Sequence, residues 1–482
     1  MIDVRPVAHS IGRLTAVFGA LMVAPGVVDW WAGDPHWQVF AEVGLVCALL
    51  GALVAIATAG RGGELMLEQA FLLTSGVWLV LPVVGALPFV MGEPHASFVD
   101  ALFEAMSGMT TTGATAFPDL DGLPLGTHLW RAMLQWTGGL GIIVVAMLFL
   151  PVMRIGGMQF FRSEGFDTLG KIMPRAGQIA SEITRIYILL TIACAVTYAA
   201  LGMSGFDAIF HAMTTASSGG FSSRDASFGA FIGPLEIASC VFMILATIPF
   251  VRIVQAVYGD IRPLWRDSQI HAYLMVLGTI TGLIVLYRML FLGETDLGHL
   301  LRETSFNVVT TVSGTGYFSA DPQRWGELAL ALLIVGGLIG GCTGSTACSV
   351  KIFRYQVLIR SVEAQIVRMQ SPHRVAHPRF EGRRLDPDVV TSVTAFFTLF
   401  MLTFGVLIVA LALTGLHTRT ALTAAWTAIT NVGPAWGPEV TANGSVAGFP
   451  ASAKWLMIAG MYVGRLELLA VYVLFLPRFW RQ

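Results

Sequence analysis

The sequence contains few charged residues. Only 12% of its 482 residues are charged and 55% are hydrophobic, whereas soluble domains carry about 25% charged residues. This composition indicates a polytopic membrane protein. The formal net charge of −1 leaves no excess of basic residues for a nucleic-acid-binding face, so nucleic acid is excluded as a partner.

The sequence also lacks the motifs of enzymes and nucleotide-binding domains. It contains no glycine-rich dinucleotide motif after a strand, no P-loop and no HExxH zinc motif. Its longest predicted inner loop, 351–388, is too short for a nucleotide-binding domain. The five cysteines lie in apolar segments without metal-ligand spacing, which predicts buried packing thiols. We therefore expect neither an enzyme nor a chain that binds a cofactor of its own.

Long hydrophobic runs dominate the chain, and a helix needs about 20 apolar residues to cross the hydrocarbon core. The uncharged candidates are 70–91, 132–151, 186–206, 328–350 and 389–416. The shorter or flanked candidates are 14–28, 43–60, 237–251, 272–287 and 455–476. Most of the 29 basic residues then fall on one face, which the positive-inside rule assigns, with the N-terminus, to the cytoplasm. The other face carries acids such as Glu439, which either concentrate cations or are scattered loop charges.

Four short polar runs interrupt the hydrophobic pattern and align with one another without gaps. They are ALFEAMSGMTTTG (101–113), AIFHAMTTASSGG (208–220), TSFNVVTTVSGTG (304–316) and ALTAAWTAITNVG (421–433). Each ends in glycine, has Ser or Thr three residues earlier, and lies between two predicted spans. We predict an all-α polytopic membrane protein with four pseudo-symmetric repeats of helix, pore helix, polar loop and helix around one central pore. The predicted boundaries are 1–63 for two leading helices and 64–155, 156–255, 256–356 and 357–482 for the repeats.

Repeats of this kind can line a path for a cation across a membrane. Irregular backbone at membrane depth is tolerated where it lines a water-filled path, and glycine accepts the positive φ that turns a carbonyl inward. Four such segments can form rings of carbonyl oxygens that replace the hydration shell of a cation. The C-terminal ends of the short helices add negative potential there. The alternative is an inherited duplication whose loops merely turn the chain.

At these runs the chain resembles the Trk/Ktr/HKT superfamily of potassium transporters, and within it the TrkH proteins most. The resemblance rests on MTTTGAT, SSGGFSS, VSGTGYFS and TNVGPAWGP in this order, and on QWTGGLGIIV and GRLELLAVYVLF. It covers nearly the whole chain and implies a homodimer in a bacterial inner membrane. Each subunit would take up K⁺, and less selectively Rb⁺, through its own pore, driven by the membrane potential.

The resemblance also implies which residues form the K⁺ selectivity filter. They are Thr110, Thr111, Thr112 and Gly113, then Ser217, Ser218, Gly219 and Gly220, then Ser313, Gly314, Thr315 and Gly316, and finally Thr430, Asn431, Val432 and Gly433. Backbone carbonyls of Thr111, Thr112, Ser218, Gly219, Gly314, Thr315, Asn431 and Val432 would hold the ion. The second loop has an extra glycine, Gly219, and the fourth loop departs most from the others.

A glycine-rich run, GGLIGGCTGSTACSVK (336–351), lies inside a predicted span. Each glycine costs about 1 kcal/mol relative to alanine in a helix, so the run indicates either close helix packing through small residues or a broken helix. The resemblance implies a broken helix with an intramembrane gating loop below the filter. Its residues would be Gly340, Gly341, Thr343, Gly344, Ser345 and Thr346.

Arg465 lies in an otherwise apolar segment, where a charge is costly and usually functional. In the family, the arginine of the matching GRLE motif projects into the pore below the filter, which makes Arg465 a candidate barrier to cations. The alternative is a structural ion pair, although Glu467, two residues further on, would face away on a helix.

Three functional classes follow from these patterns. The first is a channel-like K⁺ uptake subunit. The resemblance implies that a cytosolic TrkA-type subunit, which binds NAD(H), ATP or ADP, gates it, and the basic loops 154–175 and 354–384 are the candidate docking surfaces. Those loops are alternatively simple positive-inside anchors. The second class is a K⁺/H⁺ or K⁺/Na⁺ symporter of the same fold, which would need an intramembrane carboxylate; Glu104, Asp207 and Glu236 lie near the outer end. The third is a membrane enzyme or scaffold, which no catalytic constellation supports.

Overall fold

The computed structural model describes residues 2–60, 66–148, 153, 157, 158, 176–371, 373 and 376–481. Within them the regular secondary structure is helical except for one two-stranded antiparallel hairpin, which confirms the all-α membrane fold class. The predicted boundaries at 63/64 and 155/156, and the basic loop 154–175 apart from 157 and 158, lie outside these residues.

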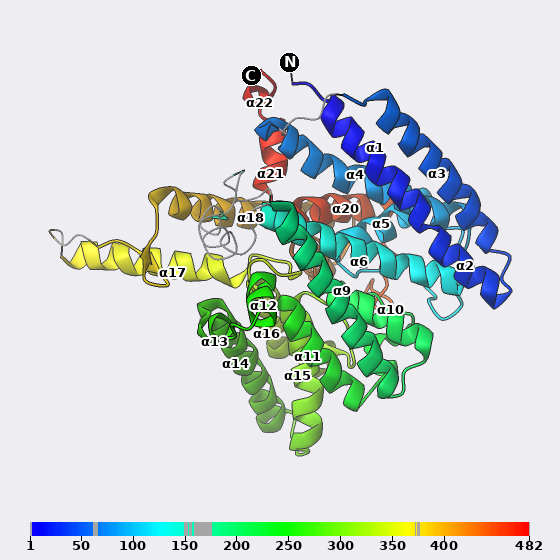
Figure 1. The fold of residues 1–482 in the computed structure, drawn as a ribbon. Coiled ribbons are helices and arrows are strands. Elements are labelled where there is room, and N and C mark those ends of the chain that lie inside the picture. Colours follow the sequence, from blue (N-terminus) through cyan, green and yellow to red (C-terminus); the bar gives the residue numbers. More distant parts are fainter. Residues whose placement is uncertain are drawn as a thin grey trace.

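Long and short helices alternate along the chain (Figure 1). The first are α1 (Arg5–Leu21), α2 (Val23–Ala32) and α3 (Trp37–Ala57). They are followed by α4 (Leu67–Met91), α5 (Phe98–Met109) and α6 (Leu125–Leu148). Next come α9 (Ala176–Ala200), α10 (Gly205–Ala216), η1 (Ser227–Ala230), α11 (Pro234–Thr247) and α12 (Phe250–Val257).

The second half of the chain has the same alternation of long and short helices. It begins with α13 (Arg262–Arg266), α14 (Ser268–Phe291), α15 (Leu297–Ser313), η2 (Pro322–Trp325) and α16 (Glu327–Ile339). It continues with α17 (Ile352–Gln370), β1 (Arg379–Phe380), β2 (Arg383–Arg384), α18 (Pro387–Leu413) and α19 (Thr418–Thr430). It ends with α20 (Ala451–Arg465), α21 (Leu469–Tyr472), η3 (Val473–Phe475) and α22 (Pro477–Trp480).

Among the described residues, six helices are long and apolar enough to cross a membrane, or eight if two bent pairs each count as one span. The bends are 98° between α11 and α12 and 103° between α20 and the segment Leu469–Phe475. The sequence predicted about ten spans and treated 237–251 and 455–476 as continuous. Both are broken, because hydropathy sums over a segment and does not detect a break within it. In 328–350 the glycine-rich run left close helix packing or a broken helix open, and the helix ends there at Ile339.

The first and third helices pack through small residues, so that their backbones approach closely. A Cβ added to Gly19 would lie 2.5 Å from the Ala48 nitrogen, and one added to Gly51 would lie 2.4 Å from the Ala16 nitrogen. The α1–α3 pair lies along one side of the molecule (Figure 1).

The four short helices α5, α10, α15 and α19 form the centre of the fold. Besides its own flanking helices, each one contacts the last helix of the preceding unit: α10 contacts α6, α15 contacts α11, α19 contacts α16, and α5 contacts α20. This order closes on itself. Phe103, Phe210 and Phe306, which stand at equivalent places in the first three short helices, are all fully buried.

Candidate functional site

Each short helix ends in the same backbone conformation, two residues before the final glycine of its run. There the chain turns left-handed, with φ of 52° at Thr111, 52° at Ser218, 84° at Gly314 and 54° at Asn431. The following N–H group donates back to the last turn, from Thr112 to the Ser107 oxygen at 2.8 Å. Gly219 donates to Thr214 and Val432 to Thr427 in the same way. This pattern is a Schellman cap, which satisfies helix carbonyls as the chain leaves the axis.

The four final glycines meet in a ring. A Cβ on Gly113 would lie 2.2 Å from the Gly219 oxygen, and one on Gly220 would lie 1.8 Å from the Thr315 oxygen. A Cβ on Gly316 would meet the Gly433 nitrogen at 2.6 Å, and one on Gly433 would meet the Thr112 oxygen at 3.1 Å. Each loop thus packs its glycine against the next loop, and the fourth returns to the first.

The sign of φ alternates along three of these loops. Gly113, Gly220 and Gly316 have φ of 85°, 75° and 83°, while Gly433 does not have a positive φ. Two left-handed residues separated by one ordinary residue turn successive carbonyls toward one side. The fourth loop therefore departs from the others in backbone as well as in sequence.

A small outer cavity of about 40 Å³ lies over this ring, and all four glycines line it. Arg131, Arg224 and Asp225 also line it. The side chain of Asn443, from the loop between α19 and α20, donates to the Asp225 carboxylate at 2.8 Å. The cavity is thus built from segments of all four units.

The hydroxyl groups three residues before each glycine bond mainly to their own helices. Thr110 donates to the Met106 carbonyl and Thr430 to the Trp426 carbonyl, both at 2.7 Å. Ser217 and Ser313 donate to carbonyls three residues earlier. These bonds fix the helix ends, so a direct role of the hydroxyl oxygens as ion ligands stays a prediction.

The glycine-rich run after α16 lies directly beneath the ring. The helix ends at Ile339, and residues 340–351 are not helical. Thr346 forms a hydroxyl–hydroxyl bond of 2.7 Å with Ser218, and its own hydroxyl also lies 2.9 Å from the Ala246 carbonyl. The Phe250 nitrogen donates to the Gly344 carbonyl at 2.9 Å. The segment is therefore held between the second polar loop and the break that separates α11 from α12.

Arg465 ends α20 at the same level of the molecule. Its Nη1 lies 2.6 Å from Cys348 Sγ, and Cys348 Sγ lies 3.5 Å from the Thr111 hydroxyl. Within the described part of the chain, Nε and Nη2 of Arg465 have no hydrogen-bond partner. Glu467 bonds instead to Lys351 at 2.9 Å and to Arg354, so the alternative of a structural Arg465–Glu467 pair is not what the structure shows.

Comparisons with known proteins identify the family. A family model described as TrkH, cation transport protein, matches residues 36–482. The potassium uptake proteins TrkI of Halomonas elongata and TrkH of Escherichia coli K12 are 38% and 33% identical; the alignments cover 99% of this chain in both cases, and 97% and 99% of those proteins. The crystal structure of the potassium transporter TrkH from Vibrio parahaemolyticus matches with a TM-score of 0.92 and 31% identity over 100% of both chains.

The chain belongs to the TrkH family. It is therefore a multi-pass membrane protein of a cation transport family, and a transport protein rather than an enzyme. All five cysteines are free, and all but Cys240 are buried. Burial agrees with the predicted packing role of the thiols, but Cys348 also has the polar contacts with Arg465 and Thr111.

Within this TrkH-family chain the sequence did not identify a polar cluster on α6. Arg131 Nε donates to Glu104 at 2.8 Å, and both side chains are fully buried. Glu104 in turn accepts hydrogen bonds from Thr115 and the Ala116 nitrogen, just after the first glycine. Gln135, one turn after Arg131, reaches the second loop. The sequence contained one indication of this cluster: Arg131 and Gln135 are four residues apart in an apolar segment and therefore share a helix face.

In the other three units as well, a side chain of the short helix hydrogen-bonds the segment that follows the final glycine. His211 and Asn307 occupy the place of Glu104 in their runs, and each side chain hydrogen-bonds the segment after its glycine: His211 bonds the Ser222 hydroxyl at 3.1 Å and Asn307 donates to the Ser319 hydroxyl at 3.1 Å. In the fourth run the Thr423 hydroxyl donates to the Trp436 carbonyl at 2.6 Å. The ring is thus braced from the helix side in all four units.

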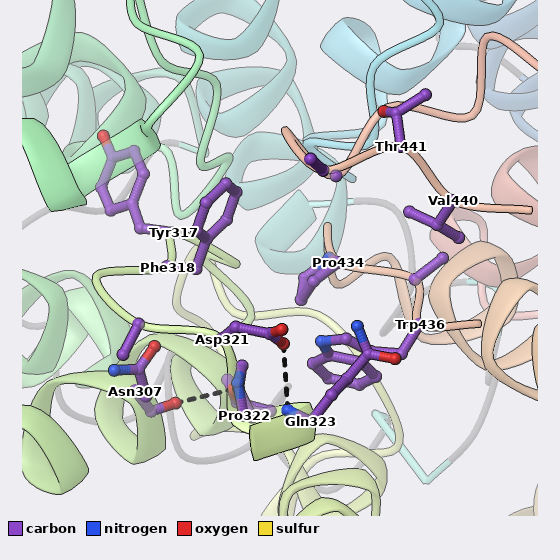
Figure 2. A pocket seen from close by; sticks show the side chains of 15 residues that line it. Asn307, Tyr317, Phe318, Asp321, Pro322, Gln323, Pro434, Trp436, Val440 and Thr441 are labelled. Carbon is purple, nitrogen blue, oxygen red and sulfur yellow. Dashed lines mark hydrogen bonds between the residues drawn. The ribbon is translucent and has the colours of Figure 1, made fainter. Parts of the chain in front are cut away.

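A second outer cavity, of about 150 Å³, lies between the third and fourth loops beside the ring (Figure 2). Figure 2 shows Tyr317 and Phe318 on one side and Pro434 and Trp436 on the other, with Asp321 between them. The Asp321 carboxylate accepts a hydrogen bond from the Gln323 nitrogen at 3.0 Å.

Glu439, in the loop between α19 and α20, is an acid that the sequence assigned to the face opposite the basic residues; it is bonded to the start of α19. Burial of its carboxylate opposes ionisation, but hydrogen bonds from the Thr420 hydroxyl and from the backbone and ring of His417 outweigh it and lower the pKa of Glu439 to about 2. Glu439 consequently stays negative at physiological pH.

Proposed function

We propose that the chain is a K⁺-selective, channel-like translocation subunit of a Trk-type uptake system. The observation that carries the proposal is the closed ring of four glycine-ended loops, in which each glycine packs against the backbone of the next loop. Rings of backbone carbonyls replace a cation's hydration shell. The names of the relatives, Trk system potassium uptake proteins, support K⁺ as the ion.

The ion would be held by the carbonyls of the two residues before each glycine. In the first three loops the sign of φ alternates, which favours carbonyls that point toward the same side. The short helices would direct their negative C-terminal ends toward the same point, which adds to the attraction for a cation. The less regular fourth loop would contribute a weaker ligand set and limit selectivity.

The alternative is a K⁺/H⁺ or K⁺/Na⁺ symporter of the same fold. Coupling would need a carboxylate that changes its partner or its proton during transport. The three candidate carboxylates each have an arginine partner: Glu104 pairs with Arg131, Asp207 with Arg224 and Glu236 with Arg302, at 2.8 to 3.0 Å. Such fixed pairs favour passive permeation over coupling.

Radioactive rubidium flux into liposomes that contain the purified protein distinguishes the two mechanisms. With proton and sodium gradients clamped to zero, we expect rubidium uptake to follow the imposed membrane voltage. A strict requirement for a proton or sodium gradient would overturn the channel-like mechanism in favour of symport. Empty liposomes, and liposomes with voltage clamped to zero, are the controls.

Residues 340–351 and Arg465 would form the gate below the filter. The segment lies across the path beneath Thr111 and Ser218, and a fixed guanidinium there repels cations. A cytosolic TrkA-type subunit that binds NAD(H), ATP or ADP would move the segment. This chain would carry no cofactor of its own.

The regulatory subunit would dock on the cytoplasmic face of a homodimer in the bacterial inner membrane, with the N-terminus inside. Among the residues that the structure describes, the candidate docking elements are α17 and the β1–β2 hairpin. They carry the basic residues Arg360, Arg379, Arg383 and Arg384. Rubidium flux measured with and without the purified subunit, at fixed nucleotide, tests this partner. Flux that does not respond to the subunit would contradict the regulatory scheme but not the filter.

A further inference from the structure

Gly219 is the position at which the second loop differs from the other three. The residue before the final glycine is Thr112, Thr315 or Val432 elsewhere, but Gly219 here. Gly219 does not have a positive φ, so its backbone conformation does not require glycine. A Cβ at Gly219 would instead lie 2.4 Å from both Cδ and Oε1 of Gln135. The Gln135 side chain therefore occupies the space that a side chain would fill in the other loops.

Gln135 comes from α6, in the preceding unit, and holds the second loop at two points. Its Nε2 donates to the Gly219 carbonyl at 2.6 Å, and its Oε1 accepts from the Phe221 nitrogen at 3.1 Å. The opposite orientation of the amide would place donor against donor and acceptor against acceptor, so the two backbone groups fix it. The amide thus spans Gly220, and the side chain is fully buried.

Arg131, one turn earlier on the same face of α6, extends this contact. Its Nη1 donates to the Ser222 carbonyl at 2.8 Å, and its guanidinium lies 4.3 Å from the Phe221 ring centroid. The same arginine holds Glu104, which anchors the first loop. The α6 helix is therefore connected to the segments that follow the final glycines of both the first and the second loop.

The Gly219 carbonyl is unusual among the four carbonyls at this level. Within the residues that the structure describes, no side chain donates to the carbonyl of Thr112, Thr315 or Val432. A carbonyl with a donor at 2.6 Å is restricted in orientation and shares its electron density with that donor. Selectivity in a carbonyl filter depends on the number and field strength of the ligands.

We propose that Gln135 is a positioning residue that sets the direction and strength of the Gly219 carbonyl and thereby contributes to K⁺ over Na⁺ selectivity. The inference rests on the proposed function of the ring as a K⁺ filter. Gln135 touches no ion itself; it acts through the second loop. Gly219 is glycine because this amide needs its space.

The first test compares Gln135→Leu with the wild type in K⁺/Na⁺ bi-ionic reversal-potential measurements. Leucine keeps the approximate volume but removes both hydrogen bonds, so the permeability ratio should fall by about fivefold while K⁺ current persists. Thr137→Val is the matched control, because the Thr137 hydroxyl bonds carbonyls of its own helix and, at 3.8 Å, Met109 Sδ, but no group of the second loop; its ratio should not change. A wild-type ratio in Gln135→Leu would overturn the inference.

A second test does not depend on whether Gln135→Leu folds. Gly219→Ala should reduce the yield of folded, conducting protein, and the same change should cost much less in a Gln135→Ala background, because the steric conflict is gone. Equal losses in both backgrounds would contradict the steric relation. Gly113→Ser distinguishes a failure of the positioning role from a failure of the filter assignment. If Gly113→Ser changes the permeability ratio and Gln135→Leu does not, only the positioning role of Gln135 is contradicted. If neither changes the ratio, the filter itself is wrongly assigned.

Discussion

At the scale of single residues, the least expected conformation is that of Thr111. It is a β-branched residue in the left-handed region, with φ of 52°, and such conformations cost on the order of 1–3 kcal/mol. The Schellman cap of α5 and the contact of its hydroxyl with Cys348 hold it there. Asn431 takes the same conformation more readily, since Asn is enriched in it. Strain that survives at Thr111 is consistent with a functional position.

Gly113 gives the most direct residue-scale prediction. Gly113→Ser places a Cβ 2.2 Å from the Gly219 oxygen at a φ of 85°, so the carbonyl ring must shift. We expect the K⁺/Na⁺ permeability ratio to fall by about tenfold, which corresponds to about 1.4 kcal/mol. Gly278→Ser, at a position with no atom within 4 Å of the added Cβ, is the control. An unchanged ratio in Gly113→Ser means that the ring is not the filter.

Arg465 gives a prediction of opposite sign. Arg465→Gln removes a buried positive charge beside Cys348, and a like charge a few ångström away costs a cation on the order of 1–4 kcal/mol. Rubidium flux without the regulatory subunit should therefore rise by about tenfold. Arg360→Gln, which removes an exposed charge paired with Glu363, should leave this basal flux unchanged. Basal flux that stays low in a folded Arg465→Gln protein would rule out the barrier.

At the scale of elements, the segment 340–351 is attached on three sides. It bonds the break between α11 and α12 through Gly344 and Thr346, and it touches the second polar loop through Ser218. At its end, Lys351 and Arg354 form a buried cluster with Glu467, where α20 bends. The segment and the break between α11 and α12 thus satisfy one another's backbone groups, as a membrane interior requires, whereas the bend after α20 is joined to the segment by side-chain ion pairs.

Deletion of Gly344 to Thr346 tests the segment as a gate. The deletion removes the bonds to Phe250, Ala246 and Ser218 and shortens the segment beneath the ring. Basal rubidium flux should rise several-fold, and the K⁺/Na⁺ ratio should stay near the wild-type value. Ser345→Ala, which removes two bonds that stay within the segment, one to the Cys342 carbonyl and one from the Ala347 nitrogen, is the control. A closed pore after the deletion would count against the gate.

The packing of α1 on α3 predicts an effect on stability alone. Gly51→Leu forces a side chain against the Ala16 nitrogen, 2.4 Å from the added Cβ, and overpacking typically costs about 1–3 kcal/mol. The thermal midpoint in detergent, followed by size-exclusion fluorescence, should fall, while ion selectivity stays unchanged. Gly278→Leu, in open space on α14, should unfold at the wild-type temperature. A shifted ion selectivity in Gly51→Leu would instead connect this helix pair to the pore.

At the scale of the whole molecule, the closed cycle of contacts among α5, α10, α15 and α19 and their neighbours places four distant segments at one point. One chain thereby builds a nearly four-fold ring that is not strictly symmetric. The differences are specific: Gly433 lacks a positive φ, Gly219 contacts Gln135, and Arg465 occurs in the fourth unit only. A single chain can vary one quarter of such a ring without changing the others.

The repeat in the sequence predicted the fold class, and it singled out the four segments that the structure brings together, because the pattern of each unit is local. The bends after Thr247 and Arg465 were missed, since hydropathy sums over a segment and does not detect where its backbone bonds are exchanged. The relation between Gln135 and Gly219 was also missed. It depends on a contact between units, which no single segment of sequence contains.

The position of the permeant ion tests the filter most directly. Anomalous diffraction from crystals grown in rubidium should show density on the axis of the ring, between the carbonyl oxygens of Thr112, Gly219, Thr315 and Val432. In crystals of Gly113→Ser this density should weaken or disappear. Rubidium bound elsewhere in the molecule, with none inside the ring of a transport-competent protein, would contradict the assignment of the four loops as the K⁺ filter.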